Sequence, residues 1–236
     1  MTLALRRMYA IFQKDLKDVS KNMYISTTAL TPLLLAVFYG RMDNITVDMY
    51  YFIINFTFAL VAVFVQAAII AEEKEKNTLR GLMLSPASAG EILLGKSLLT
   101  LAFTAVTLAL SIFLVGYEIP NVPVIVSALF ISVLFYTALG TLLGLLTKTV
   151  MEASVALLPV MFVFGFTPLI DAVINQYSAF SFLEYMPNMQ LVDLAAQMET
   201  GGGFAEAWQP LLIITAWFAA ALAAAWVVYT KRMTDS

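Results

Sequence analysis

The sequence contains neither cysteine nor histidine. Without cysteine the chain can form no disulfide, and zinc sites built from cysteine and histidine are excluded. The lack of histidine also removes the commonest general base and the side chain that usually titrates near neutral pH. A carboxylate metal site or a pair of acidic residues remains possible.

Charge is also scarce. Charged residues make up 12% of the 236 residues, and hydrophobic residues make up 61%. Soluble domains carry roughly 25% charged residues. A chain this apolar cannot hide its hydrophobic side chains behind a polar surface, so the composition predicts a membrane protein. The formal net charge of −3 adds little.

Long apolar segments predict how the chain crosses the bilayer. A helix needs about 20 mostly apolar residues to span the hydrocarbon core. The segments that qualify are 23–40, 50–71, 92–116, 123–146, 153–170 and 209–230. We therefore expect an all-α polytopic membrane protein with six transmembrane helices, forming a single domain over residues 1–236.

Residues 1–22 predict a helix that lies in the membrane interface. Their apolar side chains recur at spacings of three and four, which places them on one helical face. These side chains are Leu5, Met8, Tyr9, Phe12, Leu16 and Val19. The segment is too long and too mixed in charge for a signal peptide, and its basic face suits anionic headgroups. The alternative is a solvated leader helix.

The basic residues predict the orientation. With six spans and an inner N-terminus, twelve of the thirteen lysines and arginines fall on the cytoplasmic side, and only Arg41 falls outside. The positive-inside rule favours this arrangement, with both termini in the cytoplasm. Residues 171–208 then lie outside, where we expect short helices that rest on the surface or dip into the membrane before the sixth span.

One motif is misleading. Residues 90–97, Gly-Glu-Ile-Leu-Leu-Gly-Lys-Ser, satisfy the P-loop pattern. A P-loop joins a buried strand to a helix. Here the preceding residues are a charged loop, and a membrane span follows. We therefore expect Lys96 to extend from the third span to the headgroups rather than to bind phosphate.

Residues 72–86 are charged and amphipathic. We expect a short helix with acidic residues in its first turn, apolar side chains at Leu79, Leu82 and Met83, and an end at Pro86. The next helix restarts with a capping box between Ser88 and Glu91. This segment is either a docking surface for a soluble partner or an ordinary solvated loop.

The chain resembles ABC-2 type transporter permeases at this point. The matching pattern is E-K-x-x-T-L-x-x-L-x-x-S-P followed by E-I-L-L-G-K. It falls on Glu75, Lys76, Thr78, Leu79, Leu82, Ser85, Pro86 and residues 91–96. Asn77 stands where the family commonly has glycine. The predicted spans agree with the family architecture over nearly the whole chain.

The resemblance implies a transmembrane subunit without its own ATPase, in the plasma membrane of a bacterium or archaeon. Two permease subunits, identical or related, would each take one nucleotide-binding subunit. ATP and Mg²⁺ would belong to that partner, with no cofactor in this chain and no nucleic acid involved. The implied ATPase-coupling residues are Glu72, Glu73, Glu75, Lys76, Thr78, Leu79, Arg80 and Leu82.

The few polar residues within the spans are candidates for a substrate path. Together with two side chains of the irregular fifth span, the candidates are Thr28, Thr31, Asn55, Gln66, Met161 and Phe164. Such a path would suit a hydrophobic or amphipathic cargo that is exported by alternating access. The alternative is that these groups only satisfy neighbouring helices.

Two other function classes compete. A membrane-embedded enzyme would have to use interfacial carboxylates, for which Asp171, Glu184 and Asp193 are the candidates. An ATP-independent channel or carrier would have no need of a charged docking segment. No acidic residue lies deep within a predicted span, so ion-coupled transport has little support.

Overall fold

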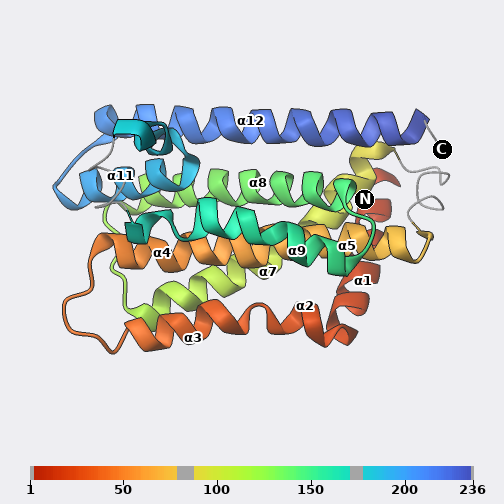
Figure 1. The fold of residues 1–236 in the computed structure, drawn as a ribbon, viewed down its shortest axis with the longest axis horizontal. Coiled ribbons are helices and arrows are strands. Elements are labelled where there is room, and N and C mark those ends of the chain that lie inside the picture. The colour runs from red at the N-terminus through yellow and green to blue at the C-terminus, as the bar shows by residue number, and fades with distance from the viewer. Residues whose placement is uncertain (1–2, 79–87, 171–177, 235–236) are drawn as a thin grey trace.

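The computed structural model describes residues 3–78, 88–170 and 178–234 of the chain, and within these ranges every element is helical. Most helices run along one common direction, whereas α1 lies across one end of the bundle (Figure 1). The elements are α1 Leu3–Lys21, α2 Met23–Thr27, α3 Leu30–Tyr39, α4 Val47–Thr57, η1 Phe58–Val63, α5 Phe64–Glu75, α7 Ala89–Val115, α8 Val122–Leu146, α9 Val150–Val160, η2 Met161–Gly165, η3 Thr167–Ile170, η4 Ser178–Tyr185, α11 Pro187–Glu199 and α12 Phe204–Thr234.

Four helices are long and apolar enough to cross a membrane. They are Val47–Glu75, Gly90–Val115, Val122–Leu146 and Phe204–Lys231, and they coincide with the second, third, fourth and sixth predicted spans. Shorter apolar helices, Leu30–Tyr39 and Val150–Gly165, occupy the places of the first and fifth. Both shorter regions contain proline.

Proline explains where the first of these regions breaks. Pro32 has no N–H, and its ring crowds the carbonyl group four residues earlier, at Thr28. Helix α2 ends at Thr27 and α3 begins at Leu30, so the break falls at that carbonyl. In the other region α9 contains Pro159 and continues as the π-helix η2 and then the 3-10 helix η3.

The continuous helix α4–η1–α5 forms the core of the bundle, since 94% of an apolar stretch of 18 residues within it is buried. Helix α8 approaches it through two glycines. A Cβ atom at Gly140 would lie 2.5 Å from the Val63 carbonyl oxygen, and one at Gly144 would lie 2.8 Å from that of Ala67. The small-residue pattern of α8 therefore serves packing within the chain.

The start of α7 confirms the predicted capping box. The hydroxyl oxygen of Ser88 accepts a hydrogen bond from the backbone N–H of Glu91 at 3.2 Å, and the Glu91 carboxylate accepts one from the Ser88 N–H at 2.8 Å. These bonds satisfy two N–H groups that have no partner within the helix. The helix begins at Ala89, three residues before the predicted span.

Short helices do precede the last long helix. They are η4 and α11, and α12 begins at Phe204 rather than at residue 209. Helix α11 packs against α12, α4 and α8, and most of its residues between Pro187 and Ala195 are buried. It is thus part of the bundle at the end opposite α1 (Figure 1). Residues 171–177 lie outside the described ranges.

Candidate functional site

The acidic residues that were expected to open a new helix lie instead at the end of α5. Helix α5 continues to Glu75, and the N–H of Lys76 still donates to the Glu72 carbonyl at 3.0 Å. The expectation of acidic residues in the first turn of a new helix is therefore wrong. Asn77, which follows α5, has a φ of 56°, a left-handed conformation that asparagine tolerates and glycine adopts freely.

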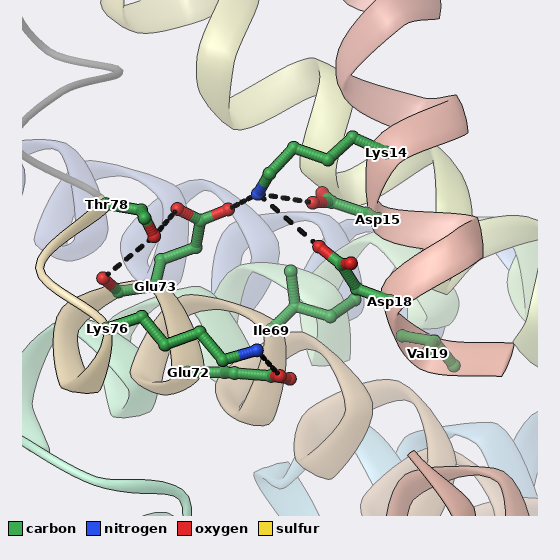
Figure 2. A pocket seen from close by; sticks show the side chains of 9 residues that line it. All are labelled: Lys14, Asp15, Asp18, Val19, Ile69, Glu72, Glu73, Lys76 and Thr78. Carbon is green, nitrogen blue, oxygen red and sulfur yellow. Dashed lines mark hydrogen bonds and ion pairs between the residues drawn. The ribbon is translucent and has the colours of Figure 1, made fainter. Parts of the chain in front are cut away.

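Carboxylates at a helix C-terminus are unfavourable because the helix dipole is negative there. Nearby lysines compensate for this cost. Glu72 pairs with Lys76 at 2.5 Å on the surface, and Glu73 pairs with Lys14 of α1. Figure 2 shows both pairs and the bond that the Thr78 hydroxyl donates to Glu73 at 2.5 Å.

Glu73 also belongs to a buried ion cluster that joins three helices. The Lys96 ammonium of α7 lies 3.1 Å from the Glu73 carboxylate and 3.4 Å from that of Asp15 in α1. Lys96, Asp15 and Glu73 are each at most 4% exposed. Lys14 joins the cluster through Glu73 and also lies 3.6 Å from the Asp18 carboxylate. We call α1, the last turn of α5 and the first turns of α7 the charged end.

The expectation that Lys96 extends to the headgroups is wrong, since the residue is completely buried. Its two carboxylate partners come from residues 81 and 23 positions earlier in the sequence. An ammonium group buried with two carboxylates is more favourable than an isolated buried charge. Lys96 therefore joins α7 to α1 and α5.

The cluster also changes how two of its members titrate. Burial raises the pKa of the Asp15 carboxyl group, and the nearby Lys96 and Lys14 only partly offset this effect. Burial lowers the pKa of Lys14, but its bond and charge interaction with Glu73 outweigh that effect, so the pKa is raised overall. Lys14 therefore stays charged, whereas the charge on Asp15 is disfavoured.

A close approach of α1 to α7 makes this cluster possible. Gly95 precedes Lys96, and a Cβ atom at Gly95 would lie 3.0 Å from the Ile11 side chain and 3.3 Å from the Met8 carbonyl oxygen. The buried face of α1 contains Ile11, Asp15 and Val19. Leu5, Tyr9 and Leu16, from the predicted apolar face, are exposed.

Sequence reasoning missed Lys74, which connects α5 to α8. Its ammonium donates to the carbonyl oxygens of Gly144 at 3.2 Å and Leu145 at 2.8 Å, and also to that of Thr147. The next residue, Glu75, accepts a hydrogen bond at 3.2 Å from the N–H of Val150 in α9. A lysine and a glutamate in a charged run carry no sequence signal that predicts these partners.

The predicted coupling residues thus have different surroundings. Glu75, Lys76 and Thr78 are exposed, Glu72 is half-buried, and Glu73 is buried within the charged end. Leu79, Arg80 and Leu82 lie outside the described residues. Only the exposed side chains are available to a soluble partner, and Glu73 serves the internal cluster instead.

Of the substrate-path candidates, Gln66 and Asn55 are fully buried and hydrogen-bonded. Gln66 accepts a bond from the Thr100 hydroxyl at 2.6 Å and donates to the hydroxyl oxygens of Thr141 at 3.0 Å and Ser97 at 3.3 Å. We call these four side chains the Gln66 network. Asn55 accepts from the Tyr136 hydroxyl at 3.4 Å and donates to the Asn188 carbonyl, also at 3.4 Å.

The other four candidates lie in the α2–α3 region and in η2. The hydroxyl of Thr28, the residue after α2, donates to the Ile25 carbonyl, and Thr31 of α3 is exposed. Met161 and Phe164 lie half-buried in the π-helix η2. Phe164 packs on Tyr136 with ring centroids 5.9 Å apart, so Asn55 and Phe164 both contact the Tyr136 side chain.

The carboxylates named for an enzyme do not form a metal centre in the described part of the chain. Glu184 of η4 and Asp193 of α11 are both exposed, and Asp171 lies outside the described residues. Among the residues that the structure describes, no group of three acidic side chains could hold a metal ion.

No curated protein matches the chain in a sequence search. The family described as "ABC-2 family transporter protein" matches residues 2–227, which is nearly the entire sequence. This match agrees with the apolar helices and with the residue pattern around residues 75–96. The chain therefore belongs to the ABC-2 transporter permeases, multi-pass membrane subunits that carry no catalytic site of their own and work with a nucleotide-binding subunit.

Proposed function

We propose that the chain is the permease subunit of an ATP-driven exporter, docked to its nucleotide-binding subunit through residues 75–82. The observation that carries the proposal is the exposure of Glu75, Lys76 and Thr78 at the charged end of an ABC-2 permease. These side chains stand where the chain leaves α5, beside a cluster that joins the same helix to α1 and α7.

The proposal places the charged end and both termini in the cytoplasm, with six membrane crossings. The basic residues support this orientation through the positive-inside rule. The α2–α3 and α9–η2–η3 segments run beside the long helices over much of the bundle, which supports counting them as crossings (Figure 1). Helix α1, lying across the bundle end with Leu5, Tyr9 and Leu16 exposed, suits the membrane interface.

The complete transporter would contain two permease subunits and two nucleotide-binding subunits, which bind ATP and Mg²⁺. The cargo is hydrophobic or amphipathic, and it leaves the cell by alternating access. What supports this cargo class is the apolar surroundings of the η2 candidates, Met161 and Phe164, beside the aromatic side chains of Phe135 and Tyr136.

The docking proposal is tested by co-purification. The chain is expressed with an ABC ATPase subunit that co-purifies with it, and the double variant Arg80→Glu/Leu82→Asp is compared with Arg41→Glu, a charge reversal at the predicted outer side. We expect the double variant to lose the ATPase subunit and the Arg41 variant to retain it. ATPase that stays bound to the double variant at the unsubstituted ratio would overturn the docking proposal.

A further inference from the structure

Two consecutive residues of α5 hold the two sides of the connection between α8 and α9. Lys74 donates to the last carbonyl groups of α8, at Gly144 and Leu145, and to the carbonyl of Thr147. Glu75 accepts from the N–H of Val150, the first residue of α9. The connection between these contacts is only three residues long, from Thr147 to Thr149.

The chemistry of each contact suits the helix end that it touches. The last carbonyl groups and the first N–H groups of a helix have no partner within the helix. The C-terminus of α8 is partly negative and receives an ammonium group, while the N-terminus of α9 is partly positive and receives a carboxylate. Both contacts are charge-assisted hydrogen bonds, which are stronger than neutral ones.

Close packing extends this attachment along α9. Ala67 and Ala71 of α5 pack against Ala153 of α9, and all three are fully buried. Further along, the π-helix η1 that precedes α5 contacts the π-helix η2 that follows α9. Small side chains bring the helix backbones close together, and interiors packed in this way move as units rather than deforming smoothly.

We propose that Lys74 and Glu75 are positioning residues that make α9 and η2 move with the end of α5. This inference rests on the proposed docking of an ATPase at residues 75–82. Movement of that segment would then displace η2, with Met161 and Phe164, relative to α7. The α8–α9 connection takes part in coupling through α5, without itself having to contact the ATPase.

The absence of cysteine in the natural sequence makes the test direct. Spin labels on introduced cysteines would report two distances in the complex of permease and ATPase subunit. The pair Lys76→Cys/Leu94→Cys follows the end of α5 relative to α7, and the pair Met151→Cys/Leu94→Cys follows α9 relative to α7. All three positions are exposed.

Each distance is measured by pulsed electron paramagnetic resonance without nucleotide and with ATP plus vanadate, in labelled complexes that retain the ATPase subunit on purification. In the otherwise unsubstituted chain, we expect both distances to change. In the Lys74→Met background, which leaves every residue named for docking unchanged, we expect the 76–94 change to persist and the 151–94 change to fall by at least half. A 151–94 change of undiminished size would overturn the proposal.

Two control backgrounds separate positioning from folding. Lys148→Met makes the same chemical change within the same connection without touching the α5 contacts, and both distance changes should persist. Lys74→Arg retains a cationic donor and should preserve the 151–94 change. If Lys74→Met fails to fold, the variant Lys74→Gln replaces it and is judged by the same two distances.

The distances also distinguish the two proposals. If neither distance changes in the unsubstituted complex, the proposed ATP-driven function fails, and this inference fails with it. If the 76–94 distance changes but the 151–94 distance does not, only the positioning role of Lys74 and Glu75 is overturned.

Discussion

Two regions of this bundle that bury polar groups differ in chemistry. At the charged end the buried groups are ions, with Lys96 held between Asp15 and Glu73. Deeper in the bundle they are neutral, with the Gln66 amide bound to hydroxyl groups. An unpaired ion costs far more to bury than an unpaired amide or hydroxyl group. The charged end therefore depends on the pairing of opposite charges, and the interior depends on close geometry.

The largest effect should come from removing the cation of the cluster. Lys96→Met leaves Asp15 and Glu73 buried without their shared partner. Breaking a buried ion pair in this way costs about 3–5 kcal/mol. We expect a loss of stability of that size, measured by SDS titration in mixed micelles. Adding Asp15→Asn should restore part of the loss, because one of the two carboxylates is then neutral.

A loss below about 1 kcal/mol for Lys96→Met would show that the cluster is solvated in the membrane, because exposed ion pairs contribute only that much. The comparison between a charged and a neutral region would then no longer hold.

The variant Gly140→Ala tests whether the stability of the interior depends on close packing between helices. A Cβ atom there would lie 2.5 Å from the Val63 carbonyl oxygen, which belongs to the backbone and cannot rotate away. Gly140→Ala should therefore cost about 1–3 kcal/mol through forced separation of α8 from η1. The same SDS titration measures it.

Gly90→Ala is the matched control for Gly140→Ala. No atom lies within 4 Å of a Cβ built at Gly90 in the described structure, and alanine favours helices over glycine by roughly 0.5–1 kcal/mol. Gly90→Ala should thus be neutral or stabilising. Equal effects for the two variants would contradict a tight α8–η1 contact.

The neutral character of the Gln66 network predicts a smaller effect. Gln66→Leu removes an amide, but the hydroxyls of Ser97 and Thr141 already donate to carbonyls of their own helices, at Leu93 and Thr137. Only Thr100 loses its acceptor, so we expect a cost of about 1 kcal/mol. A cost as large as that of Lys96→Met would remove the distinction between the two regions.

These regions also mark how far the sequence predicts the structure. The spans around Asn55, Leu108 and Leu139 could be predicted because local composition alone determines them. The Ser88–Glu91 capping box was equally predictable, since both partners lie within one helical turn. Local patterns of this kind need no knowledge of the tertiary fold.

Long-range contacts could not be predicted in the same way. Lys96 resembled an anchor at the membrane surface because its partner Asp15 lies 81 residues earlier, on a helix that the sequence does not place against it. The run of charges at residues 72–76 likewise resembled the start of a helix. Its true place, at the end of α5, depends on lysines contributed by α1 and α7.

The smallest predicted effect concerns the titration of Asp15, which sharpens the comparison within the charged end itself. Burial raises its pKa above the ordinary value of 3.8, so folding favours the protonated carboxyl group. The stability that Asp15 contributes is therefore full below pH 3.8 and is lost as the pH rises through the raised pKa.

The variant Asp15→Asn has no titrating group at this position. Its stability should therefore rise relative to that of the unsubstituted chain as the pH increases through this range. SDS titrations of both proteins from about pH 4 to pH 8 measure this difference. A shift in the opposite direction would mean that pairing with Lys96, rather than burial, dominates the surroundings of Asp15.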